Sequence, residues 1–268
     1  MRFTDTDATR LYFEDRGSGP ALLLVHGHPF DHTMWQPQID RFSLTHRVIA
    51  PDLRGYGITP PGATADIAGL TDLGDFAEDL VELLDLLEIE EAVVAGLSMG
   101  GQIAMELHRR LPERVRGLVL ADTFPAAETD EGKAARNAMA DRLLKEGMRG
   151  YADEVLDRMV APYNTHAAPH VHRMMCATDP VGAAAALRGR AERPDYRESL
   201  TTVAVPALVV VGRDDTYTPV ADAEEMHALL PHSTLAVIER AAHLPNLEQP
   251  EEFDSVLDSY LRSLVRPS

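Results

Sequence analysis

Short apolar runs alternate with longer amphipathic segments along most of the chain. Apolar runs of this length, rich in β-branched residues and bounded by polar or turn residues, are typical of strands in a largely buried parallel sheet. We therefore predict strands at Arg10–Glu14, Ala21–Val25, Arg47–Ala50, Ala92–Ala95, Leu118–Ala121, Ala207–Val211 and Thr234–Ile238.

The segment between the third and fourth runs has the pattern of an amphipathic helix. Apolar residues recur at intervals of three and four positions from Leu73 to Leu87, with Glu78 and Glu82 between them. Further helical patterns cover the residues after Ser98, Ala221–Leu230 and Pro250–Leu264. Strands that alternate with helices predict an α/β fold, in which a mostly parallel central β-sheet is flanked by helices.

One interval breaks this alternation. Residues 124–206 lack a strand pattern, are rich in Ala, Met, Arg and His, and form a stretch too long for a plain loop. We predict that they form a helical cap with flanking linkers, and that residues 1–123 and 207–268 form the core. The cap would lie over the carboxyl edge of the sheet, where open α/β sheets bind ligands.

Composition narrows the classes of partner. The formal net charge is −18, from 25 Lys and Arg against 43 Asp and Glu. Such a field repels phosphate backbones and anionic membranes, so neither nucleic acid nor a membrane is expected as a partner. It also disfavours an anionic substrate unless the pocket carries local positive charge.

Cysteine content and hydropathy indicate the compartment. Cys176 is the single cysteine, so no intrachain disulfide can form, and acidic residues occupy the N-terminal segment where a signal sequence is apolar. No apolar run approaches the roughly 20 residues that span a bilayer. We expect a cytoplasmic protein.

The stretch "VVAGLSMGGQIAMEL" places Ser98 between Gly96 and Gly100, where a β-branched run changes to a helical pattern. This strand, turn and helix context is that of a nucleophilic serine on a tight turn, where neighbours without side chains allow close approach. The alternative is a glycine-rich turn with Ser98 as a helix cap. Neither a Gly-x-Gly-x-x-Gly motif nor a phosphate-binding loop is present, so a nucleotide cofactor is not expected.

A nucleophilic serine needs a base and an acid. His243 follows the last predicted strand, at the edge where the serine turn emerges, whereas His232 precedes that strand. Asp214 and Asp215 follow the penultimate strand, and spacing alone does not rank them. Asp122 also ends a strand, where a structural or capping role is the simpler interpretation.

Two backbone N–H groups are needed to bind the developing oxyanion. One belongs to Met99, the residue after the nucleophile. The other lies in "VHGHPFDHTMW", where Pro29 has no N–H and His28 is favoured. His26 and His28 could instead bind a metal, but two histidines without a third ligand argue against it.

With these residues in place, the chain resembles the α/β-hydrolase family, in particular the compact bacterial esterases, enol-lactonases, perhydrolases and carbon-carbon bond hydrolases. The likeness covers nearly the whole chain, through "HGHP", "APDLRGYG", "GLSMGG", "GRDDTYTP" and "AAHLPNLEQPEEF". It implies a triad of Ser98, Asp215 and His243, and it prefers Asp215 because the family acid commonly falls third after the glycine, here Gly212. Ala242 departs from the glycine frequent before the family histidine, and we expect only a small effect on loop geometry.

The resemblance implies a serine hydrolase that cleaves a small carboxylic ester or lactone through an acyl-enzyme, without cofactor or metal. Serine at position 98 argues against dehalogenase and epoxide-hydrolase relatives, which attack with aspartate. The alternatives are a carbon-carbon bond hydrolase of a ring-fission product, a non-catalytic small-molecule receptor and a cofactor-free oxygenase, all on the same fold.

Large side chains near the turn and in the cap are candidates for substrate binding, although aromatic and methionine side chains also fill cores. They are Phe30, Trp35, Phe124, Tyr163, Met174 and Met175. A metal at the cluster of His166, His170, His172 and Cys176 is not expected, because Pro169 keeps the first two histidines from sharing a helical face. Exposed apolar surface on the cap could support a homodimer.

Overall fold

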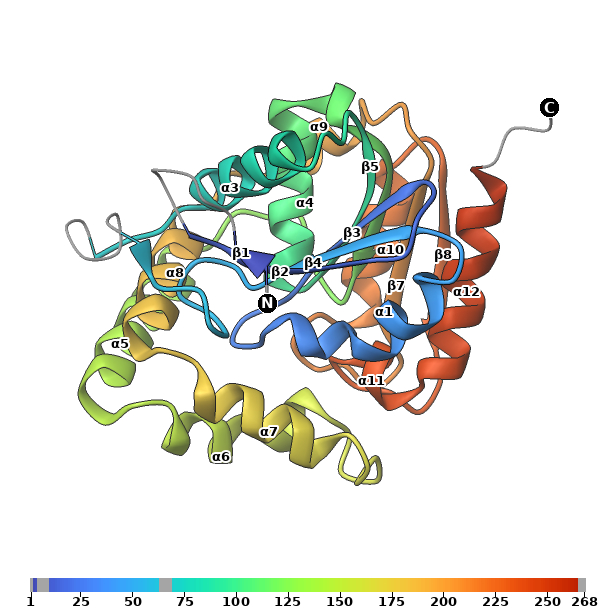
Figure 1. The fold of residues 1–268 in the computed structure, drawn as a ribbon. Coiled ribbons are helices and arrows are strands. Elements are labelled where there is room, and N and C mark those ends of the chain that lie inside the picture. Colours follow the sequence, from blue (N-terminus) through green and yellow to red (C-terminus); the bar gives the residue numbers. More distant parts are fainter. Residues whose placement is uncertain (1, 4–9, 63–68, 265–268) are drawn as a thin grey trace.

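An eight-stranded sheet forms the centre of the molecule. The computed structural model describes residues 2–3, 10–62 and 69–264 (Figure 1). The strands are β1 (Arg2–Phe3), β2 (Tyr12–Arg16), β3 (Ala21–Val25), β4 (Arg47–Pro51), β5 (Ala92–Leu97), β6 (Val115–Ala121), β7 (Ala207–Gly212) and β8 (Ser233–Ile238).

The strands lie in the order β1-β2-β4-β3-β5-β6-β7-β8. The pairs β1–β2 and β2–β4 are antiparallel, and the other pairs are parallel. This order confirms the predicted mostly parallel sheet. The loops that follow β3, β5, β7 and β8 all leave from the same edge, because those strands run in the same direction.

Helices cover both faces of the sheet. The helices of the described residues outside the β6–β7 segment are η1 (His32–Trp35), α1 (Gln36–Phe42), α3 (Leu73–Leu86), α4 (Met99–Arg110), η2 (Pro112–Arg114), α10 (Val220–Leu229), α11 (Pro245–Glu248) and α12 (Pro250–Ser263). Side chains of β3 alternate between the two faces: Leu23 and Val25 pack in one apolar cluster with α3 and α4, whereas Leu22 and Leu24 pack in another with α1 and α12. None of the helices in the described part of the chain is long and apolar enough to cross a membrane.

The segment between β6 and β7, all of which the structure describes, is helical and contains no strand. Figure 1 shows the first four of these helices gathered to one side of the sheet, whereas the short fifth helix lies apart from them. They are α5 (Asp130–Glu146), α6 (Arg149–Met159), α7 (Ala168–Ala177), α8 (Pro180–Ala191) and α9 (Arg197–Leu200). Helix α8 packs directly against the residues that precede α3, because a Cβ on Gly189 would lie 1.8 Å from the carbonyl oxygen of Thr71.

The structure corrects the predicted elements mainly at their ends. The bounds of the first predicted strand, Arg10–Glu14, are wrong by two residues. Strand β2 begins at Tyr12 and continues to Arg16, because its pairing with β4 extends to the partners Arg16 and Val48. The short strand β1 was not predicted, since two residues carry no periodic pattern. The predicted helix Leu73–Leu87 is confirmed as α3, which begins with a capping box formed by Asp72 and Asp75.

Candidate active site

Ser98 lies at the turn between β5 and α4, in a backbone conformation that residues other than glycine rarely adopt. Its φ is 55° and its ψ is −115°. The turn is tight on both sides: a Cβ on Gly96 would lie 2.1 Å from the carbonyl oxygen of Gly100, and one on Gly100 would lie 2.2 Å from that of Val25. Glycine is therefore required at both positions, and the strain at Ser98 is held by the strand and helix around it.

The hydroxyl of Ser98 does not cap α4. It makes no capping hydrogen bond, although Ser98 is the residue that precedes the helix. The main chain is fixed instead, because the Ser98 N–H donates to Ala121 and its carbonyl accepts from Thr123 Oγ1 at 2.7 Å. The structure thus contradicts the interpretation of Ser98 as a capping residue and leaves its side chain for another role.

His243 and Asp215 form a buried pair beside this turn. Nδ1 of His243 lies 2.7 Å from Oδ2 of Asp215, and the two side chains are 3% and 0% exposed. The carboxylate also accepts from the N–H of Tyr217 at 2.7 Å and from the N–H and hydroxyl of Thr218. Burial raises the pKa of Asp215, but the charge of His243 and these hydrogen bonds outweigh it, so the pKa lies below its usual value.

The structure distinguishes Asp215 from Asp214 and Asp122, the other two carboxylates considered in the sequence analysis. Asp214 is exposed, and its side chain accepts from the hydroxyl of Tyr163. Asp122 is buried, and its Oδ1 accepts from the N–H of Gly212 at 2.9 Å, which ties the ends of β6 and β7 together. Burial and the neighbouring Asp215 raise the pKa of Asp122 well above its usual value. Among the three carboxylates, Asp215 is the one hydrogen-bonded to the histidine.

The loop that carries His243 is held by a buried carboxylate that sequence analysis missed. Glu248 Oε1 accepts from the N–H groups of Ala242 and Leu244 at 2.9 and 3.2 Å, on either side of the histidine. Its Oε2 accepts from the N–H of Ala161 and from the side chain of Asn164, both at 2.8 Å. Glu248 thus connects the histidine loop to the segment between α6 and α7.

Ser98 and His243 line one cavity of about 170 Å³. Phe124, a predicted substrate contact, also lines it. The other predicted contacts are not among its lining residues in the described chain: Phe30, Trp35, Tyr163, Met174 and Met175. Four of these five are fully or almost fully buried in the apolar cluster around α1, α7 and α12, and the fifth, Tyr163, is 49% exposed.

The backbone amides of His28 and Met99 both lie beside Ser98. Neither N–H donates a hydrogen bond to any part of the chain that the structure describes. The loop after β3 approaches the turn closely, because a Cβ on Gly27 would lie 3.3 Å from that of Ser98. The two N–H groups that the sequence analysis selected thus have no acceptor among the described residues, and of the two residues His28 lines the cavity.

The histidines of this loop make contacts within the protein. His26 Nδ1 donates to the carbonyl of Gly27, and its Nε2 accepts from the N–H of Leu53 at 3.0 Å. His28 Nδ1 lies 2.8 Å from the hydroxyl of Tyr56, while its Nε2 is buried without a partner among the described residues. Burial and nearby arginines hold the pKa of His28 well below its usual value, so the ring is neutral at pH 7.

The histidine and cysteine cluster of the segment between β6 and β7 does not converge on one point. His166 lies 3.3 Å from the carbonyl of Leu247, and His170 contacts Thr33. His172 Nε2 lies 2.6 Å from Asp153. Within the cluster, one pair of members is in contact, Cys176 and His172.

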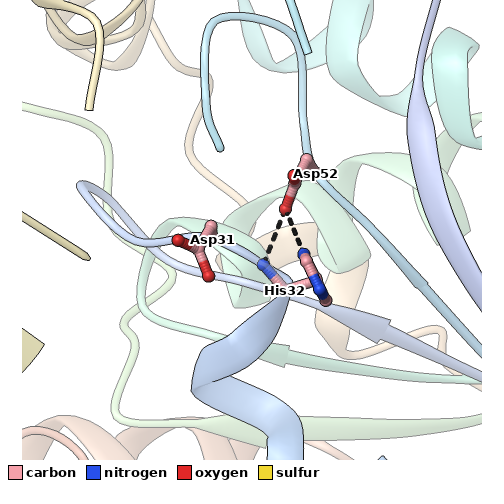
Figure 2. Close-up of side chains that lie close together, drawn as sticks. All are labelled: Asp31, His32 and Asp52. Carbon is pink, nitrogen blue, oxygen red and sulfur yellow. Dashed lines mark hydrogen bonds and ion pairs between the residues drawn. The ribbon is translucent and has the colours of Figure 1, made fainter. Parts of the chain in front are cut away.

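A second group with metal-ligand chemistry, Asp31, His32 and Asp52, lies at the start of η1 (Figure 2). Oδ1 of Asp52 accepts from the N–H of His32 at 2.8 Å and faces Nδ1 of the same residue at 2.7 Å. Asp31 caps η1 by accepting from Thr33. These carboxylates hold the loop through backbone hydrogen bonds, as caps do.

Charged and aromatic residues from the β6–β7 segment complete the cavity lining, and sequence analysis did not select them. They are Arg136, Tyr151 and Arg190, joined by Tyr217 from the loop after β7. Arg190 belongs to the alanine-rich stretch "GAAAALRGRAE". Nothing in the sequence indicated that Arg190 is buried, because arginine side chains are mostly exposed in proteins.

Comparison with known proteins identifies the family of this chain. A family model described as "Alpha/beta hydrolase family" matches residues 22–256. The chain belongs to the alpha/beta hydrolase family. Among the relatives of this alpha/beta hydrolase are an enol-lactonase and an esterase, each 30% identical to it.

The first is 3-oxoadipate enol-lactonase 1 from Acinetobacter baylyi, which aligns over 92% of this chain and 90% of its own. The second is a pimeloyl-[acyl-carrier protein] methyl ester esterase from Aliivibrio salmonicida, which aligns over 95% and 97%. A solved thermophilic esterase from Thermogutta terrifontis, with malate bound, is 34% identical. It superposes with a TM-score of 0.94 over 98% of this chain and 99% of its own.

Proposed function

We infer that this alpha/beta hydrolase cleaves a small carboxylic ester or lactone through a covalent acyl intermediate on Ser98. One observation carries the inference: Ser98 and His243 line the same cavity, and Asp215 binds Nδ1 of His243. With Nδ1 hydrogen-bonded to the carboxylate, Nε2 is the ring nitrogen that can accept the proton of the serine.

The reaction would follow from this arrangement. His243 removes the proton as Ser98 Oγ attacks the substrate carbonyl carbon, and Asp215 stabilises the charged imidazole. The N–H groups of His28 and Met99 donate to the oxyanion. The intermediate then expels the alcohol oxygen, which takes the proton from His243. Water activated by His243 attacks the acyl group, releasing the acid and restoring Ser98.

The cavity supports a small substrate. Its volume of about 170 Å³ lies below the range of about 300–1000 Å³ usual for pockets that hold drug-sized ligands. Long-chain acyl groups would not fit without movement of the surrounding helices. The names of the relatives, a lactonase and a methyl ester esterase, belong to the same class of carboxylic ester chemistry.

The test is covalent labelling with a fluorophosphonate probe, combined with hydrolysis of p-nitrophenyl acetate and of simple lactones. We expect the label on the peptide that contains Ser98, and loss of both label and hydrolysis in Ser98→Ala. Ser259→Ala is the matched control, since this exposed serine on α12 lies far along the chain from the turn.

Absence of label on Ser98 in folded protein, together with no hydrolysis, would overturn the inference. Oxygen uptake that survives Ser98→Ala would favour an oxygenase instead. Loss of visible absorption from a ring-fission product, at a rate above ester hydrolysis, would favour carbon-carbon bond cleavage.

A further inference from the structure

Arg190 is a buried cation at the wall of the cavity, and no acidic side chain in the described part of the chain pairs with it. It lies on α8, is 7% exposed, and lines the cavity together with Ser98 and His243. Its Nε donates to Oε1 of Gln102 at 3.1 Å. Within the described residues it has no ion pair, and that amide is the one side chain that accepts from it.

The neighbouring charges make this imbalance larger. Arg136 also lines the cavity, and Arg193 lies one turn beyond Arg190. Both pair with the same carboxylate, Glu128, Arg193 through Nη1 at 3.0 Å. Two of the three guanidinium groups therefore share one carboxylate, and Arg190 pairs with no acid among the described residues, in a protein whose formal net charge is −18. This side of the cavity thus carries a local excess of positive charge, although the molecule as a whole is acidic.

A buried charge without a partner is costly, and proteins normally pair it or hydrogen-bond it fully. Burial and the repulsion from Arg136 and Arg193 hold the pKa of Arg190 well below its usual value. A guanidinium nevertheless stays protonated at neutral pH. Further polar groups near it also lack partners within the described chain: Nε2 of Gln102 and Nε2 of His28 are buried without a hydrogen bond.

We propose that the cavity takes substrates that carry a carboxylate, and that Arg190 pairs with this carboxylate while Ser98 attacks the ester or lactone carbonyl. The proposal rests on the proposed hydrolase function and specifies its substrate class. Half-esters of short dicarboxylic acids and small lactones that bear a carboxylate have this chemistry. The two N–H groups on one edge of the planar guanidinium match the two oxygens of a carboxylate. Each charge-assisted hydrogen bond is about twice as strong as a neutral one.

The test compares two methyl esters of the same shape that differ in charge, monomethyl glutarate and its neutral amide, methyl glutaramate. We expect the wild type to show kcat/KM at least about 10-fold higher for the anionic ester, the effect of one charge-assisted contact. Arg190→Met keeps the apolar stem of the side chain and removes the charge. It should lower kcat/KM for the anionic ester about 30-fold and change that for the amide less than about threefold.

Arg188→Met is the matched control, because it makes the same substitution two positions away on the same helix. The Arg188 guanidinium bonds to Asp141 and to the carbonyl of Gly69, and Arg188 does not line the cavity. We expect this variant to keep the wild-type preference for the anionic ester. Equal losses on both esters in folded Arg190→Met, or no preference in the wild type, would overturn the proposal.

Two further experiments distinguish failure of this proposal from misfolding of the variant and from failure of the proposed hydrolase function. If Arg190→Met does not fold, judged by circular dichroism, Arg190→Lys replaces it and should retain a reduced preference for the anionic ester; an unchanged or absent preference would overturn the proposal.

Calorimetric titration of Ser98→Ala with glutarate, with phosphate as competitor, measures recognition without turnover. Binding of glutarate that Arg190→Met abolishes supports the carboxylate site even if Ser98 proves unreactive, whereas equal binding of phosphate would reduce the site to a general anion site and overturn it.

Discussion

Two pairs of histidine and aspartate in this molecule make nearly the same hydrogen bond and lie in very different surroundings. In each, Nδ1 of the histidine is 2.7 Å from a carboxylate oxygen: His243 with Asp215, and His32 with Asp52. His243 lines a cavity together with Ser98, whereas Asp52 binds the backbone at the start of η1 (Figure 2). The hydrogen bond by itself therefore does not identify a catalytic base. The position of the imidazole relative to a nucleophile does.

The largest difference between the two pairs should appear in turnover. His243→Gln removes the proposed base, and we expect kcat/KM for p-nitrophenyl acetate to fall about 10⁴- to 10⁶-fold. His32→Gln, the same substitution in the other pair, should leave kcat/KM within about threefold, because that ring does not line the cavity. Comparable losses in both variants would show that the two pairs are not functionally distinct.

A slightly smaller effect should distinguish neighbouring carboxylates. Asp215→Asn leaves the shape of the side chain but removes the charge that orients His243, so we expect kcat to fall about 10⁴-fold. Asp214→Asn changes the adjacent, exposed residue, whose partner is the hydroxyl of Tyr163, and should retain activity. Steady-state kinetics on both variants checks this. A larger loss in Asp214→Asn would reverse the assignment of the acid.

The histidine loop should also depend on Glu248. Glu248→Gln replaces one acceptor oxygen by an NH₂ group that faces the N–H groups of the histidine loop or those of the segment between α6 and α7. We expect the free energy of unfolding to fall by about 1–3 kcal/mol, the cost of an unsatisfied buried polar group. Urea denaturation checks this, with the exposed Glu251→Gln on α12 as control. Equal stability of the two variants would remove Glu248 from the account of how His243 is held.

The smallest expected effect is a pH dependence of stability at the His32 pair. Burial lowers the pKa of His32, but the hydrogen bond and charge of Asp52 outweigh it, so the folded pKa is raised. Stability from this histidine is complete below its unfolded pKa of about 6.5 and is lost as the pH rises through the folded pKa. His32→Gln should therefore cost about 1 kcal/mol at pH 6 and less at pH 9.

Urea unfolding at both pH values, repeated in an Asp52→Asn background, isolates the coupling between the two side chains. A coupling energy that is the same at both pH values would contradict a charge-dependent pair.

The sequence was most informative where local pattern and packing agree. The runs around Ala21–Val25 and Ala207–Val211 are apolar throughout, and they became strands buried on both faces. The Ser98 turn was recognised from its glycines, because both are required by close backbone approach. Prediction failed at Arg10–Glu14, where pairing with β4 decided which residues became the strand.

Side chains around the cavity were less predictable. Trp35 and Met175 were reasonable substrate contacts by type, yet both are buried in an apolar cluster away from the cavity lining. Arg190, which no pattern singled out, lies at the wall of the cavity. Whether a side chain faces a core or a cavity depends on which helices pack against its own helix, and a single chain's periodicity does not contain that information.

The sequence by itself thus determined the α/β architecture, the helical nature of the segment between β6 and β7, and the turn that presents Ser98. Each depends on local propensity, on hydrophobic period or on the absence of a Cβ. The family resemblance had favoured Asp215 over Asp214, but only the tertiary structure showed its contact with His243, and that Arg190 lines the cavity beside Ser98 without an acidic partner in the described part of the chain. Those relations join residues far apart in the chain, and they exist only after the parallel strands bring their carboxyl ends to one edge and α8 packs over it.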